Sequence, residues 1–140
     1  MKLILSTIIG GIVLFILGWI FYGMIFMNFM QENYGKIMRS PDDFKLWAIA
    51  VANLLEALFL AFIYPKGYKG GSPAAEGFKF GLYFGLLSGV PYIFYMWASY
   101  PIKWQTALID GVIVFVLTLI TGLVIGLIYG RIGAKKEGTA

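Results

Sequence analysis

The chain has 140 residues, of which 60% are hydrophobic and 13% are charged, and its formal net charge is +4. Soluble domains are typically about 45–50% apolar and about 25% charged, so this composition indicates a membrane protein. The sequence contains no cysteine and no histidine, which excludes disulfides, the usual zinc sites and catalysis by either residue type.

The first apolar segment is long enough to cross a bilayer. Residues 3–30 carry no charge, and a spanning helix needs about 20 residues. The segment is too long for the apolar core of a signal peptide, about 7–15 residues, and no small-x-small cleavage motif follows it. We therefore expect a retained helix over about residues 3–30 that tilts or enters the interface. Trp19 and Tyr22 lie toward its second end, where aromatic rings favour the headgroup region.

A polar segment precedes the second predicted helix. Residues 40–43 read Ser-Pro-Asp-Asp, which offers a capping serine, a proline suited to the first helical position and an acid for a capping box. We expect a helix over about residues 41–64 that ends before Pro65. Glu56 lies close to the middle of this helix, and Asn53 lies one turn earlier on the same face.

The third predicted helix carries a row of glycines. Residues 65–72 are rich in glycine and lysine and predict a loop, and we expect a helix over about residues 73–100. Positions four apart share one helix face, and small residues there let a neighbouring membrane helix approach closely. Pro91 predicts a bend, because proline frees a carbonyl of the preceding turn. The glycines spaced by four are Gly77, Gly81, Gly85 and Gly89.

The last predicted helix covers about residues 106–130, and residues 131–140 are expected to form a mobile tail. Asp110 lies one turn inside this helix. A second row of small residues comprises Thr118, Gly122, Gly126 and Gly130. Successive helices run in opposite directions, so the two rows can meet within one chain. We therefore expect the third and fourth helices to form the tightest pair.

The short connections predict an all-α integral membrane bundle of four antiparallel transmembrane helices with glycine-mediated packing, as a single domain over residues 1–140. Most lysines and arginines lie at the N-terminus, in the second loop and in the tail. The positive-inside rule then predicts that both termini are cytoplasmic, in a plasma or inner membrane. This distribution favours a role in topology over nucleic-acid binding, for which no basic helix in a soluble segment is present.

Several short motifs built on glycine together resemble a known family. They are Gly18-Trp19, Tyr22-Gly23, Ala75-Glu76-Gly77, Leu108-Ile109-Asp110-Gly111 and Thr121-Gly122. They are similar to those of a small bacterial four-helix integral membrane family catalogued as a domain of unknown function. The resemblance covers nearly the whole chain and implies an integral membrane protein, and it brings no activity with it. In the family pattern Trp and Tyr are adjacent in the first helix, whereas here two residues separate them.

Two carboxylates are candidates for chemistry within the membrane. A carboxylate at mid-membrane costs about 2.5–3.5 kcal/mol on insertion scales, so Glu56 should face protein or water. One interpretation is a proton- or cation-coupled site with Asn53 as a hydrogen-bond partner, and the other is a packing residue between helices or subunits. Asp110 lies near a helix N-terminus, where the dipole favours an acid. It therefore serves either in a site or in local capping or an interfacial pair with Lys103.

The aromatic side chains also have two interpretations. They are either anchors at the membrane interface or a binding cage for an apolar or cationic ligand; the set is Trp19, Tyr22, Tyr92, Tyr95, Trp97 and Trp104. Two carboxylates could support acid–base chemistry, but no nucleophile or set of metal ligands accompanies them. We therefore expect no enzymatic activity, no catalytic residue, no metal site and no cofactor.

These observations lead to two hypotheses about function. The first is a transport or channel-like protein for protons, cations or a small apolar or cationic solute, acting as a homo-oligomer in the lipid bilayer with Glu56 in the pathway. The candidate pathway or ligand residues are Glu56, Asn53, Asp110, Trp19 and Tyr22. The alternative is a structural or accessory membrane protein that binds lipid or partner helices through the glycine faces. A weaker third interpretation, an intramembrane enzyme, would need an additional cofactor.

Overall fold

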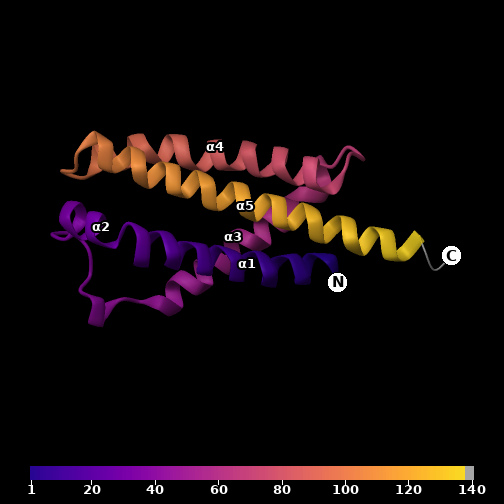
Figure 1. Ribbon diagram of the computed structural model, residues 1–140, viewed down its shortest axis with the longest axis horizontal. Coiled ribbons are helices and arrows are strands. Elements are labelled where there is room, and N and C mark those ends of the chain that lie inside the picture. Colours follow the sequence, from indigo (N-terminus) through magenta and orange to yellow (C-terminus); the bar gives the residue numbers. More distant parts are fainter. Residues whose placement is uncertain (138–140) are drawn as a thin grey trace.

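The computed structural model describes residues 1–137, with side chains described for residues 1–40 and 42–132, and this part of the chain is helical without a strand. The predicted all-α class is confirmed. The elements, in chain order (Figure 1), are α1 Lys2–Ile20, the π-helical segment η1 Phe21–Ile25, α2 Met27–Tyr34, the 3-10 turn η2 Pro41–Asp43, α3 Leu46–Gly67, α4 Pro73–Ser99 and α5 Trp104–Glu137.

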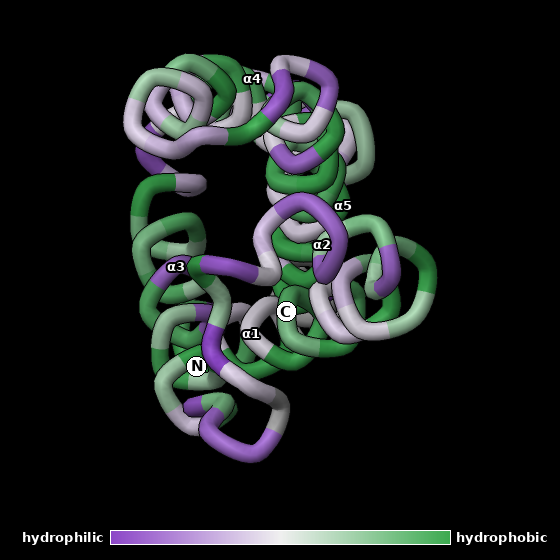
Figure 2. The backbone as a smooth tube through the Cα atoms, turned by 90° about the vertical axis from the view of Figure 1, so that its left-hand side faces the viewer, coloured by the Kyte–Doolittle hydropathy of each residue, from purple (hydrophilic) through white to green (hydrophobic). Residues whose placement is uncertain are grey.

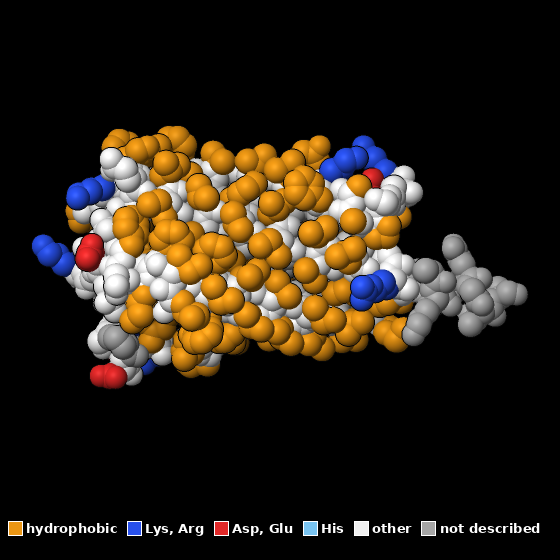
Figure 3. Space-filling model, viewed as in Figure 1, with side chains coloured by type: hydrophobic (Ala, Val, Ile, Leu, Met, Phe, Trp, Pro, Cys, Tyr) orange, Lys and Arg blue, Asp and Glu red, His pale blue; other side chains and the backbone are white. Residues whose placement is uncertain are grey.

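Among the residues that the structure describes, four helices are long and apolar enough to cross a membrane. They cover Lys2–Ile25, Leu46–Gly67, Pro73–Ser99 and Trp104–Ile132. The face seen in Figure 3 carries a broad band of hydrophobic side chains, and its charged side chains gather at the two ends. Figure 2 shows the same division along the backbone, with hydrophobic helices and hydrophilic connections. The chain thus has the features of a multi-pass membrane protein.

The prediction of one continuous first helix over residues 3–30 is wrong. The helix widens into a π turn at Phe21–Ile25, stops at Phe26 and restarts as α2 at Met27. The N–H of Phe26 donates to the carbonyl of Phe21 at 2.8 Å, five residues back, as in a π-helix. Such π segments are frequent at functional sites. Because of the break, Met30 of α2 packs back against α5 in a buried cluster.

The second long helix begins later than predicted. Residues 41–43 form only a 3-10 turn, and α3 starts at Leu46 without a side-chain cap. Asp43 does not act as a capping acid, because Arg39 and Lys45 bind its carboxylate at 2.6 and 2.5 Å. These two cations hold the pKa of the exposed Asp43 carboxyl below its usual range.

The end of α3 was predicted before Pro65, but the helix continues to Gly67. A proline removes the hydrogen bond to the carbonyl four residues earlier, which here belongs to Ala61. The hydroxyl of Tyr129 on α5 donates to that carbonyl at 2.7 Å. The helix therefore passes the proline because a neighbouring helix satisfies the freed acceptor.

The last helix is longer than predicted at both ends. It runs from Trp104 to Glu137 instead of about 106–130, so the expected boundary of a tail at residue 131 is wrong. Residues 138–140 of the predicted tail lie outside the described residues. The third helix was predicted over about residues 73–100 and covers Pro73–Ser99 without a break at Pro91.

Helices α4 and α5 share the most extensive contact in the chain. The four glycines spaced along α4 are buried, and each lies against the backbone or a side chain of α5. The contacts run in reverse order along the two helices: Gly77 beside Gly126, Gly81 beside Leu119 and Gly122, Gly85 beside Phe115, and Gly89 beside Gly111.

Helix α1 packs mainly on α3 and then on α5. Gly10 of α1 faces Ala57 of α3, and Gly11 faces Leu54. Helix α3 has few contacts with α4. Helices α4 and α5 therefore form a tight pair, α1 packs against α5, and α3 packs mainly against α1.

A methyl group at Gly81 tests the close approach of α4 and α5. Its ideal Cβ would lie 2.9 Å from the Cα of Leu119, which is a backbone atom and cannot turn aside. Overpacking of this kind costs about 1–3 kcal/mol. We expect Gly81→Ala to lower the free energy of unfolding by that amount, measured by denaturant titration in detergent micelles with circular dichroism.

Gly18→Ala is the matched control, since nothing lies within 4 Å of its Cβ. Alanine favours a helix over glycine by about 1 kcal/mol, so this variant should be unchanged or more stable. Equal effects of the two substitutions would contradict the proposed steric constraint.

Candidate functional site

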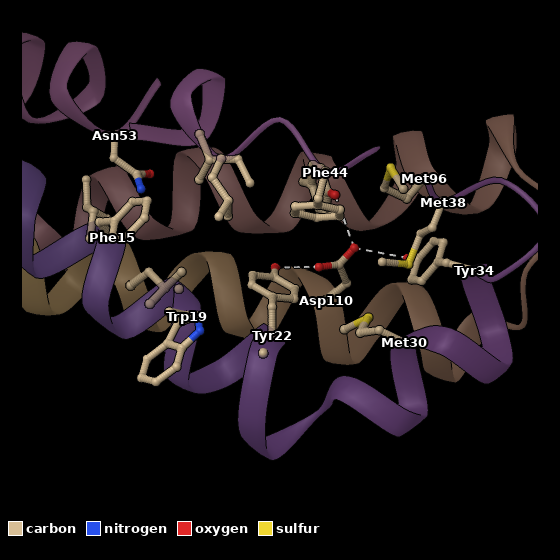
Figure 4. A pocket seen from close by; sticks show the side chains of 17 residues that line it. Phe15, Trp19, Tyr22, Met30, Tyr34, Met38, Phe44, Asn53, Met96 and Asp110 are labelled. Atoms are coloured by element: carbon tan, nitrogen blue, oxygen red, sulfur yellow. Dashed lines mark hydrogen bonds between the residues drawn. The ribbon is translucent and has the colours of Figure 1, made fainter. Parts of the chain in front are cut away.

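A buried carboxylate is the centre of the candidate site. Asp110 is only 5% exposed, and three tyrosine hydroxyls donate to it. Tyr22 donates to Oδ1 at 2.5 Å, and Tyr34 and Tyr92 donate to Oδ2 at 3.0 and 3.1 Å. Figure 4 shows the Tyr22 and Tyr34 rings directed toward the carboxylate from two sides.

Four different elements supply this cluster. Asp110 lies on α5 and Tyr92 lies on α4, while Tyr22 belongs to the π segment and Tyr34 ends α2. In an unbroken helix Tyr22 and Tyr34 would be about 18 Å apart along the axis. The break at Phe26 folds α2 back, so that both hydroxyls reach the same carboxylate.

The hydrogen-bond pattern fits an ionised Asp110. An ionised carboxylate only accepts hydrogen bonds, and all three phenols can donate to it as charge-assisted bonds. Among the described side chains the two ion pairs both involve Asp43, so no described basic residue pairs with Asp110. The alternative of a pair between Asp110 and Lys103 is therefore wrong, because burial on α5 directs the carboxylate toward the tyrosines.

Tyr34 stays a neutral donor throughout the physiological pH range. Burial raises the pKa of its hydroxyl above the ordinary value, and the adjacent Asp110 carboxylate raises it further through its charge and its hydrogen bond. An uncharged phenol can stabilise the carboxylate without adding a second negative charge.

Beside the carboxylate is a cavity of about 470 Å³, within the usual range for small-molecule sites. Its lining is mainly apolar, with aromatic or methionine side chains from α1, η1, α2, the following loop and α4, and with aliphatic and polar side chains from α3 and α5. The residues are Leu14, Phe15, Gly18, Trp19, Tyr22, Gly23, Met30, Tyr34, Met38, Phe44, Leu46, Ile49, Asn53, Tyr92, Met96, Asp110 and Leu117.

The structure brings four of the five candidate residues together at this cavity. The cavity is lined by Asn53, Trp19, Tyr22 and Asp110, although no spacing along the chain links residues so far apart. Glu56 does not line it. Glu56 is exposed on the surface of the chain. Its Oε1 accepts a hydrogen bond from the hydroxyl of Thr118 at 3.3 Å.

Tyr34 and three methionines were not predicted as site residues. Tyr34 follows several polar residues in the sequence and carries no local signal of a membrane site; only the break before α2 brings it to Asp110. Tyr92 was expected either as an interfacial anchor or as part of a binding cage, and its hydroxyl donates to the carboxylate. Tyr95 and Trp97 are 71% and 51% exposed, as anchors in lipid would be.

A second, smaller hollow of about 340 Å³ lies at the same end of the molecule and is lined by Glu32, Asn33, Lys36, Ile37, Pro101, Ile102 and Lys103. Within the part of the chain that the structure describes, no group of three or more acidic, histidine or cysteine side chains is arranged to hold a metal ion.

Comparisons with protein-family models, with curated proteins and with solved structures found no match to this chain. The resemblance to the four-helix family therefore stays a prediction, and the candidate site depends on its own geometry.

Removing one tyrosine hydroxyl tests the cluster around Asp110. Hydrogen bonds to charged groups contribute about 1.5–3 kcal/mol, so we expect Tyr34→Phe to lower the free energy of unfolding by about that amount. Tyr95→Phe is the control, since that side chain is 71% exposed and its loss should change little. Both are measured by denaturant titration in micelles, and a Tyr34→Phe variant as stable as the control would show that the bond contributes nothing.

Proposed function

We propose that the protein is a membrane protein that binds a small, largely apolar organic cation beside Asp110 and transports it across the bilayer. The observation that carries this proposal is the buried carboxylate, which has three phenol donors and no described basic partner, in the wall of a mainly apolar cavity.

Charge is the first argument. A carboxylate within an apolar site is costly unless it is compensated. Three neutral hydroxyls share its negative charge but do not cancel it. A ligand with one positive charge would complete the compensation, whereas an anionic ligand would be repelled.

The lining is the second argument. Phe15, Trp19 and Phe44 line the cavity, and aromatic faces attract organic cations with about 0.5–2 kcal/mol. Met30 and Met96 add polarizable, adaptable side chains. This combination suits a ligand with an apolar body and a single cationic group, more than a strongly hydrated metal ion.

Transport follows as part of the proposal from the position of the cavity within four spanning helices. The cavity lies toward the end of the molecule that carries α2, opposite the end where both termini lie (Figure 1). With the termini in the cytoplasm of a plasma or inner membrane, as the basic residues favour, the cavity belongs to the outer half. We also propose that the four helices are antiparallel, with glycine contacts holding α4 to α5, and that the chain acts as a homo-oligomer.

The alternative of an accessory protein with free glycine faces has less support. The row of α4 is buried, and so are Gly122 and Gly126 of α5. The chain's own helices occupy these faces, so the six glycines offer no open surface to a partner. This observation favours a binding function over an accessory one.

Two molecules of the same shape and different charge test recognition. Benzyltrimethylammonium is a cation, and neopentylbenzene is its neutral isostere. We expect the cation to bind the protein in lipid nanodiscs at least about tenfold more tightly than the isostere, a difference of about 1.4 kcal/mol. Isothermal titration calorimetry measures both affinities.

Asp110→Asn keeps the shape of the site and removes its charge, so it should abolish the preference for the cation. Trp19→Ala is a second variant, at a residue that is 61% exposed. It should weaken binding of the cation more than binding of the isostere, without unfolding the chain. Equal binding of both molecules to the natural protein, or no binding of the cation, would exclude a cation site.

Transport requires a separate measurement. Proteoliposomes containing the protein should take up radiolabelled benzyltrimethylammonium faster than empty liposomes, and Asp110→Asn should reduce the rate to the empty-liposome value. Glu56→Gln tests whether the pathway involves that residue, through the same uptake and through proton flux. If the cation binds and is not taken up, the protein binds the cation without transporting it, and the transport part of the proposal is contradicted.

A further inference from the structure

Three polar side chains from three helices form a second cluster, away from the Asp110 cavity. Glu56 lies near the middle of α3, Ser88 in the second half of α4, and Thr118 at the midpoint of the apolar part of α5. The hydroxyl oxygen of Thr118 lies 3.3 Å from Glu56 Oε1 and 3.4 Å from Ser88 Oγ. The row Glu56–Thr118–Ser88 therefore crosses the molecule near the centre of its apolar band.

The hydroxyl protons of this row have closer acceptors elsewhere. Ser88 donates to the carbonyl of Phe84 at 2.8 Å, and Thr118 donates to the carbonyl of Val114 at 3.0 Å. Each hydroxyl has a single proton. The Thr118 hydroxyl is also within hydrogen-bond distance of Glu56 Oε1 and Ser88 Oγ. When the protons of Thr118 and Ser88 stay in their shorter bonds to the carbonyls one turn back, the three oxygens present lone pairs to one another.

The distance from Thr118 Oγ1 to each of its two neighbouring oxygens suits a cation that binds adjacent ligands. Hydroxyl hydrogen bonds are typically about 2.7–2.8 Å long, shorter than either distance in the row. Oxygens that bind a hard cation at about 2.3–2.6 Å and at right angles lie roughly 3.3–3.7 Å apart. The two observed distances of 3.3 and 3.4 Å are in the second range.

We propose that Glu56 Oε1, Thr118 Oγ1 and Ser88 Oγ are ligands of a sodium ion. One carboxylate neutralises one positive charge, so a monovalent ion leaves the centre of the membrane uncharged, while a divalent ion would not. Oxygen donors without nitrogen or sulfur suit a hard cation. A proton on Glu56 is the competing occupant, since a carboxylic acid could donate to Thr118. This site does not depend on the cation proposed at Asp110.

The exposure of Glu56 makes the site accessible to a reagent. Dicyclohexylcarbodiimide partitions into membranes and adds to protonated carboxyl groups, so it reports whether Glu56 carries a proton or a metal ion. Purified protein in nanodiscs is labelled at mildly acidic pH in sodium chloride or in choline chloride of equal ionic strength. Mass spectrometry of peptides measures the adduct at Glu56 separately from any at Asp110.

We expect sodium to protect Glu56 and choline to leave it reactive. At a sodium concentration about ten times the Kd, occupancy should reduce labelling roughly tenfold. Thr118→Val keeps the shape and the carboxylate but removes one ligand, so labelling should continue in sodium chloride. Ser88→Ala removes another ligand, on α4 instead of α5, and should also weaken the protection of Glu56 by sodium.

Thr121→Val is the matched control on the same helix, since Thr121 is buried and its hydroxyl only donates to the carbonyl of Leu117. It should keep full protection by sodium. A second readout is the rise of the unfolding temperature with sodium, which Thr118→Val and Glu56→Gln should lose and Thr121→Val should keep.

Labelling that is equal in sodium and choline would overturn the proposal in favour of a protonated Glu56. Absence of labelling in choline, or protection that survives Thr118→Val, would overturn it as well.

Discussion

The close contact of α4 with α5 is the constraint on which the rest of the molecule depends. The buried glycines of α4 lie against α5 along this contact, and small residues are typical where membrane helices approach closely. The contact of Gly89 with Gly111 brings Tyr92 beside Asp110, and the contact of Gly85 with Phe115 brings Ser88 beside Thr118. A shift of one turn along either helix would separate both pairs, so the geometry of both polar sites depends on how α4 and α5 are aligned.

The break in the first membrane segment supplies the remaining tyrosine donors to Asp110. The α4–α5 pair alone gives Asp110 a single phenol, and the π turn with α2 adds two more. The π turn and α2 also contribute to the lining of the cavity, through Tyr22 and Gly23 and through Met30 and Tyr34. Irregular backbone within a membrane segment needs protein to cover it; here α2 packs against α5 through Met30 and Ile113. The cavity and the carboxylate cluster thus both depend on side chains of the π turn and of α2.

Much of this architecture could be predicted from the sequence, because bilayer thickness requires long uncharged runs and close packing requires small residues at helical spacing. Four helices long and apolar enough to span a bilayer, and the row of glycines on one face of α4, followed from these rules. The break at Phe26 could not be predicted, since a run of apolar residues looks the same whether the backbone bonds to the fourth or the fifth residue back. For the same reason Tyr34 was missed. Glu56 and Asp110 were both selected as costly charges, but their surroundings depend on helix rotation, which composition does not reveal.

The depth of the two polar sites has an electrical consequence. Moving one elementary charge across the whole membrane corresponds to about 2.3 kcal/mol per 100 mV. Thr118 is at the midpoint of the apolar part of α5, so an ion there has crossed about half of the transmembrane field, about 1 kcal/mol per 100 mV. Asp110 lies about 12 Å nearer the α2 end, close to the edge of a hydrocarbon core about 30 Å thick. The membrane potential would therefore act strongly on occupancy at the Glu56–Thr118–Ser88 row and only weakly on occupancy of the cavity, although both carry one negative side chain.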